Sequence, residues 1–212
     1  MPPRRRAVRR ARGEPSRNEM TTPSEPFAAH APAARPSPWI ERFAPLVAAG
    51  ARVLDLACGH GRHARLFAAR GCHVVAIDRD VAALAILAGE TRIETRALDL
   101  ETGAPVLAGE RFDAIVVVNY LHRPLFPQLL AALADDGVLL YETFARGNDA
   151  YGRPANPAFL LEPGELLQLI AGRLTPVAFE QGHVSAPDRE AVVQRIVAVG
   201  PGRRWPLVLP ER

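Results

Sequence analysis

The sequence predicts an α/β fold, a doubly wound and mostly parallel seven-stranded sheet with helices on both faces and a C-terminal antiparallel hairpin. Three observations support this prediction. Short apolar runs alternate with helical patterns over residues 52–144, as in a parallel sheet that is covered on both faces. The turn Gly59-His60-Gly61 joins the first run to a helix, as in nucleotide-binding folds. Two late apolar runs with a short connection between them predict the hairpin.

The elements follow from apolar spacing and from helix start and stop residues. Ser37 resembles a helix cap and Pro38 a first-turn proline, so a helix is expected over Trp39 and the apolar residues after it, against the sheet or across its mouth. Strands are predicted at 52–56, 73–77, 93–98, 112–118 and 137–144, helices at 61–70, 81–88, 125–134 and 162–171, and hairpin strands at 174–181 and 190–199.

The length of 212 residues is typical of one domain, which we place at residues 37–200 with a C-terminal tail at 201–212. Residues 1–36 are rich in Arg, Pro and Ala and carry few large apolar side chains, so we expect a disordered leader there. Cys58 and Cys72 do not make a disulfide framework, and no apolar run is long enough to span a membrane. These features predict a cytoplasmic protein.

The positive charge is concentrated at the N-terminus. Residues 1–19 hold seven arginines and two acids, a balance of +5, whereas the remaining 19 arginines and 21 acids give −2. A mildly acidic domain disfavours nucleic acid as a partner, because such binding depends on neutralising phosphates. We therefore expect a small-molecule substrate and a monomer or homodimer.

The polar residues of the predicted sheet gather at one rim, because ligands of parallel sheets bind beyond the carboxyl ends of the strands. Asp55 interrupts the first strand, and Asp78 and Asp99 end the second and third. Gly59-His60-Gly61-Arg62-His63-Ala64 also matches G-x-G-x-x-A, a form of the dinucleotide fingerprint, so NAD is one candidate ligand. The acid at position 55 instead suits the ammonium group of S-adenosylmethionine and opposes a pyrophosphate.

Several motifs occur in the order found in one family. Residues 53–61 (VLDLACGHG), 76–78 (AID), 97–100 (ALDL), 112–116 (FDAIV) and 137–140 (GVLL) resemble successive motifs of class I S-adenosylmethionine-dependent methyltransferases, which have a Rossmann-like fold. The string Cys58–His63, together with Asn119–His122, is similar to the tellurite-resistance-type small-molecule methyltransferases. The resemblance covers about residues 39–199.

The resemblance implies S-adenosylmethionine as cofactor and a set of residues that hold it. Asp55, Gly59 and Gly61 would hold its methionine end, Asp78 its ribose, and Asn119 and Tyr120 would lie beneath its methyl group. The full set of expected cofactor contacts is Asp55, Ala57, Gly59, Gly61, Asp78, Arg79, Asp99, Leu100, Asn119 and Tyr120.

Residues of the rim loops are the candidates for contact with the methyl acceptor. His122 and Arg123 follow the fourth strand, and we expect them to be the catalytic pair, with His122 as base or substrate ligand. Arg123, Arg146 and Arg153 could together hold an anionic acceptor. Glu142 and Tyr151 are further rim candidates, and no metal site is expected.

Three alternative functions remain open at this point. An NAD(P)-binding oxidoreductase would use the same glycine turn. A non-catalytic protein could bind the cofactor and act as a sensor or partner. An RNA-modifying methyltransferase is disfavoured because Asn119-Tyr120-Leu121-His122 lacks the prolines used on base amino groups, and a Pro-Cys nucleophile is also missing.

Overall fold

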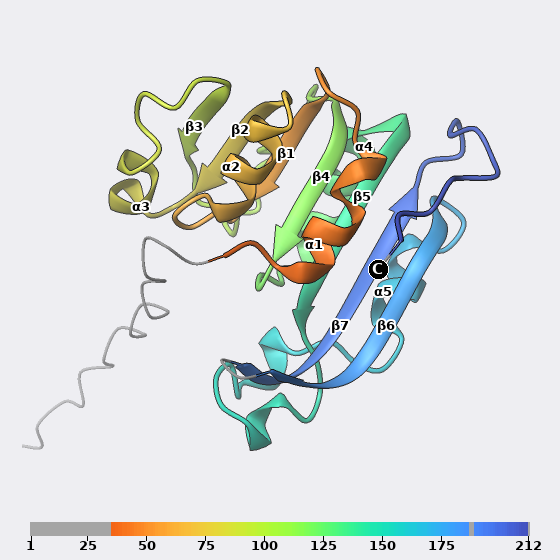
Figure 1. Cartoon of the computed structure of the whole chain (residues 1–212). Coiled ribbons are helices and arrows are strands. Elements are labelled where there is room, and N and C mark those ends of the chain that lie inside the picture. The colour runs from red at the N-terminus through yellow and green to blue at the C-terminus, as the bar shows by residue number, and fades with distance from the viewer. Residues whose placement is uncertain (1–34, 187–188, 212) are drawn as a thin grey trace, which may run out of the picture.

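The computed structural model describes residues 35–186 and 189–211, so the predicted leader lies almost wholly outside the described residues. A seven-stranded sheet runs through the molecule in the order β3-β2-β1-β4-β5-β7-β6 (Figure 1). Its strands are β1 (Arg52–Leu56), β2 (His73–Asp78), β3 (Ile93–Ala97), β4 (Phe112–Val118), β5 (Leu133–Phe144), β6 (Thr175–Ala186) and β7 (Arg189–Val199). The helices are α1 (Pro38–Phe43), α2 (Arg62–Ala69), α3 (Val81–Ala85), α4 (Phe126–Ala132) and α5 (Glu165–Ile170).

The sheet has the predicted topology. β1 pairs in parallel with β2 on one side and with β4 on the other, so the strand order reverses between β1 and β4. β7 pairs antiparallel with both β5 and β6, and it is the antiparallel strand that the hairpin brings in. The predicted fold class is confirmed. Ligands of such sheets bind where the order reverses, which is at the carboxyl ends of β1 and β4.

Side chains of each strand alternate between two cores, one on each face of the sheet. Val53 and Val116 belong to the core that α1, α2 and α3 cover, and Leu54 and Val117 belong to the core that α4 and α5 cover. Figure 1 shows α1 and α2 on the near face and α5 behind β7 and β6. Because both faces are covered, the central strands are almost entirely apolar, and a charged side chain within them stands out.

Several boundaries differ from the predicted ones for local reasons. β3 is not apolar: Glu94 and Thr95 are exposed, because β3 is an edge strand. β5 begins at Leu133, which already pairs with Phe112, so α4 ends earlier than expected. α5 begins only at Glu165, after Gly164 at a φ of 74°.

The two ends of the described chain meet on the α1 face. Ser37 caps α1 by accepting a hydrogen bond from the Trp39 amide, and Trp39 and Phe43 are buried in the core. In the predicted tail, Arg203 donates to the backbone carbonyl of Leu46, which follows α1. Within residues 35–186 and 189–211, no helix has the length and apolar character needed to cross a membrane.

Candidate active site

The turn after β1 uses left-handed backbone at three positions, Ala57 (φ 53°), Gly59 (φ 52°) and Gly61 (φ 72°). A Cβ added at Gly61 would lie 2.5 Å from the Leu87 side chain, so this glycine lets the turn pack against the residues after α3. A Cβ added at Gly59 would have no atom within 4 Å. Gly59 therefore faces open space at the carboxyl end of β1, where a ligand can approach the backbone.

Asp78, at the end of β2, holds this turn in place. Its Oδ2 accepts a hydrogen bond from the Gly59 amide at 2.7 Å, and its Oδ1 accepts one from the Asp80 amide at 2.9 Å. Asp80 in turn caps α3 by accepting from Ala82 and Ala83. The carboxylate predicted to bind ribose thus lies directly beside the open glycine, and the exposed Arg79 follows it.

Asp55 is a buried carboxyl group within β1, with only 1% of its surface exposed. Its Oδ2 accepts a hydrogen bond from the Ala64 amide of α2 at 2.8 Å. Burial raises the pKa of Asp55 to about 7, and the Ala64 amide and the Arg62 guanidinium only partly oppose that shift. A cationic ligand group at this rim would favour the ionised carboxylate.

The segment after β4 carries polar atoms that lack partners. Asn119 has a φ of 58°, and its backbone amide donates to the backbone carbonyl of Glu142 at 2.9 Å. Its side-chain Oδ1 is buried and has no hydrogen-bond partner in the described part of the chain. The Tyr120 hydroxyl is likewise buried and has no hydrogen-bond partner of standard geometry among the described residues. Burial, followed by the carboxylates of Glu101 and Asp99, raises the pKa of that hydroxyl. Such atoms fit a site whose ligand supplies the missing hydrogen bonds.

The predicted cofactor residues thus come together at one rim. Ala57, Gly59, Gly61 and Asp55 belong to β1 and its turn, Asp78 and Arg79 to the end of β2, and Asn119 and Tyr120 to the end of β4. Asp99 is exposed and accepts from the Glu101 amide, whereas Leu100 is buried in the core on the α4 face. No group of His, Cys, Asp or Glu in the described residues could hold a metal ion.

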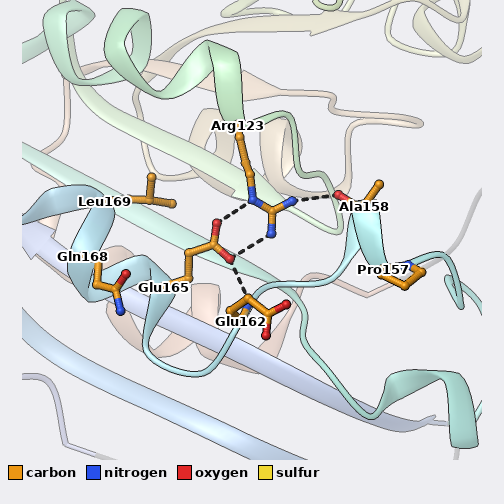
Figure 2. A pocket seen from close by; sticks show the side chains of 7 residues that line it. All are labelled: Arg123, Pro157, Ala158, Glu162, Glu165, Gln168 and Leu169. Carbon is orange, nitrogen blue, oxygen red and sulfur yellow. Dashed lines mark hydrogen bonds and ion pairs between the residues drawn. The ribbon is translucent and has the colours of Figure 1, made fainter.

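Arg123 is bound within the protein (Figure 2). Its Nε and one terminal nitrogen contact the two carboxylate oxygens of Glu165 at 2.6 and 2.8 Å, and its terminal nitrogens also donate to the carbonyls of Ala158 and Leu160. The ion pair raises the pKa of Arg123 and lowers that of Glu165. Arg123 thereby ties the loop after β4 to the segment that precedes α5.

The ion pair lines a shallow, open depression of about 630 Å³ between residues 157–159 and α5. The other lining residues are Pro157, Ala158, Glu162, Gln168 and Leu169 (Figure 2). His122 precedes Arg123, is half-buried, and its imidazole makes no hydrogen bond to another described residue. The expectation that His122 and Arg123 contact the acceptor stays a prediction.

A second loop arginine, Arg146, is also paired with an acid. Arg146 contacts Glu162 at 2.9 Å, and both side chains are at least half exposed. Tyr151 stacks on His183 with ring centroids 4.3 Å apart, and His183 contacts Glu190 at 2.9 Å. Arg123 and Arg146 therefore serve the loop structure in this conformation.

A group of three buried polar residues, which the sequence did not predict to be in contact, lies where the chain enters α1. The Ser37 amide donates to His63 Nε2 at 3.1 Å, and the Ser37 hydroxyl donates to Glu142 Oε2 at 2.6 Å. All three residues are at most 3% exposed. Burial, followed by the Arg62 guanidinium, lowers the pKa of His63 to about 3, so its ring is neutral and can accept this hydrogen bond. Glu142 was recognisable as an acid in an apolar strand, but its link to Ser37 spans 105 residues.

Comparisons with known proteins agree with this geometry. The family model described as a methyltransferase domain matches residues 27–196. Demethylmenaquinone methyltransferase of Clavibacter sepedonicus is 29% identical in an alignment of 170 residues that covers 72% of this chain and 66% of that protein. The curated relatives that the chain matches are longer, and it spans between 51% and 66% of their length.

Solved structures share the fold. TehB from Haemophilus influenzae superposes with a TM-score of 0.61 at 18% identity, over 74% of this chain and 59% of that one. The 1,6-didemethyltoxoflavin-N1-methyltransferase of Burkholderia thailandensis, solved with 1,6-didemethyltoxoflavin and S-adenosylhomocysteine, has a TM-score of 0.52 at 26% identity over 72% of each chain.

Proposed function

We propose, from the premise that the chain belongs to the family of proteins with a methyltransferase domain, that it transfers a methyl group from S-adenosylmethionine to a small molecule. The observation that carries the proposal is the open Gly59, with Asp78 bonded to its amide and the buried Asp55 in the strand before it. Acids at this rim suit a ligand with an ammonium and a sulfonium group. They oppose the pyrophosphate of a dinucleotide.

The residues present fit the cofactor in three ways. Asp55 would accept its ammonium group, and that contact would stabilise the ionised carboxylate. Gly59 gives its methionine end room against the backbone. Asp78 still has acceptor capacity for ribose hydroxyls beside its two amide contacts. Asp99 and Leu100 would meet the adenine, and Asn119 and Tyr120 the region of the methyl group.

The cofactor supplies a methyl carbon that its sulfonium group already activates. The chain has to hold the acceptor in line with that carbon, with the reacting atoms ~3–3.5 Å apart, and to exclude water. We place His122 against the acceptor, where its unbonded imidazole can accept a proton or orient the substrate. Arg123 acts as a positioning residue, because its guanidinium fixes the segment between the rim and α5.

Calorimetry with S-adenosylmethionine and with NAD, run in parallel on the same protein, tests this function. We expect S-adenosylmethionine to bind and NAD not to bind. Gly59→Ala should weaken binding about tenfold or more, because its methyl group would enter the open space above the turn. Gly109→Ala is the matched control, since Gly109 also has positive φ (75°) and open space around an added Cβ. Binding of NAD in place of S-adenosylmethionine would refute the assignment.

The finer aspects of the function rest on separate observations. The mildly acidic domain supports a small-molecule acceptor over nucleic acid. Free Cys58 and Cys72, both buried, are compatible with a reducing cytoplasm. We propose a monomer or homodimer, which light scattering will distinguish. Transfer of labelled methyl groups to extracted metabolites, with total RNA as the parallel acceptor, tests the choice of substrate.

A further inference from the structure

The group formed by Ser37, His63 and Glu142 lies on the same face of the sheet as Asp55. Val118 and Val116 of β4 belong to the core on the α1 face, and their register partners are Glu142 in β5 and Asp55 in β1. Glu142 and Asp55 are therefore separated by one strand and offset by two residues along it. Two strand spacings are ~9.5 Å. If Asp55 holds the methionine end, Glu142 lies farther along the rim, on the β5 side.

Glu142 is also adjacent to the segment proposed to lie beneath the methyl group. The amide of Asn119 donates to the Glu142 carbonyl at 2.9 Å, which joins the ends of β4 and β5 at this point. Asn119 Oδ1 is buried without a partner in the described residues. The Asn119 Oδ1 and the Glu142 carboxylate, both hydrogen-bond acceptors, thus belong to residues that meet at the ends of β4 and β5.

The Ser37 hydroxyl indicates what the carboxylate binds. The hydroxyl donates to Glu142 Oε2 at 2.6 Å, and the backbone amide of Ser37 donates to His63 Nε2. The Arg35 carbonyl accepts a hydrogen bond from Arg62, the first residue of α2 after the β1 turn, so the segment that carries this hydroxyl passes close to that turn before α1 begins. A donor on a ligand can replace a donor on the chain at the same oxygen.

Three arginines near the rim are already paired with acids: Arg123 with Glu165, Arg146 with Glu162, and Arg195 with Glu180 at 2.6 Å. An anionic acceptor that used one of these three would have to displace its acid, and the Glu142 carboxylate would repel it. A neutral amine displaces no acid and only replaces the Ser37 hydroxyl at Glu142.

We propose that Glu142 is an acceptor-binding residue and that the acceptor is an amine whose N–H takes the place of the Ser37 hydroxyl. This proposal rests on the proposed methyl transfer. In that reaction the nitrogen lone pair forms the new N–C bond while the C–S bond breaks and its electron pair returns to sulfur. Positive charge moves from sulfur to nitrogen, and a nitrogen-bound proton then leaves to solvent. A carboxylate beside the nitrogen stabilises that charge in the transition state.

Sinefungin tests the proposal without knowledge of the acceptor, because it carries an amine where S-adenosylmethionine carries the S-methyl group. We expect the intact protein to bind sinefungin about tenfold more tightly than S-adenosylhomocysteine by calorimetry. Glu142→Gln should remove most of that preference while S-adenosylhomocysteine affinity stays unchanged. Ser37→Ala, which removes the competing donor, should raise the preference. Glu162→Gln, an exposed acid of the same rim, should leave it unaltered.

The outcomes separate this proposal from the proposed function. Failure of both ligands to bind would refute the cofactor assignment itself. Binding of both ligands with the same ratio in wild type and Glu142→Gln would refute the role of Glu142 and leave the cofactor assignment standing. If Glu142→Gln melts early, the opposite shift in Ser37→Ala still decides the question. Methylation assays with phenethylamine and phenylacetate, a pair that lacks any other nucleophile, add a check: transfer to phenylacetate and not to phenethylamine would contradict the amine class.

Discussion

The Gly59 amide and the Asp78 carboxylate are joined by a hydrogen bond of 2.7 Å across the ends of β1 and β2. The bond fixes the one glycine of the turn that faces open space, and it uses the same side chain that is expected to contact ribose. The two functions are therefore coupled: removing the carboxylate changes both a ligand contact and the shape of the surface the ligand rests on.

Asp78→Asn should weaken S-adenosylmethionine binding by roughly 10–100-fold, because hydrogen bonds to a charged group contribute about 1.5–3 kcal/mol. Asp113→Asn is the matched control. Asp113 Oδ2 also accepts one backbone amide, that of Arg52, at 2.7 Å, but at the amino end of β1. Calorimetry on both variants measures the difference. Equal losses of affinity in the two variants would show that Asp78 acts only on folding.

Cofactor affinity should depend on pH through Asp55. Its pKa is about 7 without ligand, and an ammonium group requires the ionised form. Below about pH 7, binding should therefore release a proton, and affinity should fall by up to tenfold for each unit by which the pH is lowered further. Affinity should level off just above pH 7 and fall again where the ammonium group of the cofactor loses its own proton. Calorimetry in two buffers of different ionisation enthalpy counts the proton directly, and no proton release at pH 6 would contradict this role.

Two buried groups, Asp55 and His63, should give the free energy of unfolding opposite dependences on pH. The folded pKa of Asp55 lies above its unfolded value of 3.8, so the stability it contributes is present below about pH 4 and is lost as pH rises through 7. The folded pKa of His63, about 3, lies below 6.5, so its contribution is present above pH 6.5 and is lost as pH falls.

Melting temperatures between pH 4 and 6.5 test this opposition. The slopes should largely cancel in the wild type. Asp55→Asn should make stability rise with pH over this range, and His63→Gln, whose amide oxygen can still accept from Ser37, should make it fall. Parallel curves for the two variants and the wild type would rule out both assignments.

Arg123→Lys keeps the charge but loses the two-pronged contact with Glu165. Because the Arg123 side chain is 37% exposed, we expect a loss of only about 1 kcal/mol in unfolding free energy. Cofactor affinity should stay at the wild-type value, while the KM for the acceptor rises because the segment at 157–165 is less fixed. Glu165→Gln should behave alike. A change in kcat alone, with KM constant, would instead place Arg123 against the reacting atoms.

The sequence was sufficient for the sheet, and it was sufficient to expect that the acids and glycines proposed to hold the cofactor lie at one rim of that sheet, because local patterns carry that information. Apolar strands between helices predict a parallel sheet, and an acid such as Asp55 inside one is conspicuous. The ion pair of Arg123 with Glu165 could not be derived in this way, since an arginine in a loop has the same local sequence whether or not it pairs with an acid 42 residues later. Ser37 and His63 likewise lie 26 positions apart in the sequence.

Boundaries were less predictable than elements because tertiary pairing decides them. The pairing of Leu133 with Phe112 starts β5 four residues before Gly137, where the glycine-led apolar run begins. β3 is not apolar as expected, because it lies at the edge of the sheet, and that position depends on the order of the strands. The polar residues Glu94, Thr95 and Arg96 of β3 were visible in the sequence, whereas the pairing of Leu133 leaves no local signal.

The position of α1 has a consequence for synthesis of the chain. Its apolar face, which includes Trp39 and Phe43, packs in a core completed by strands made far later, and the Trp39 ring lies 4.9 Å from the Arg195 guanidinium. Arg203 binds the Leu46 carbonyl across 157 residues. The core around this helix is therefore complete only after a ribosome has added nearly the whole domain.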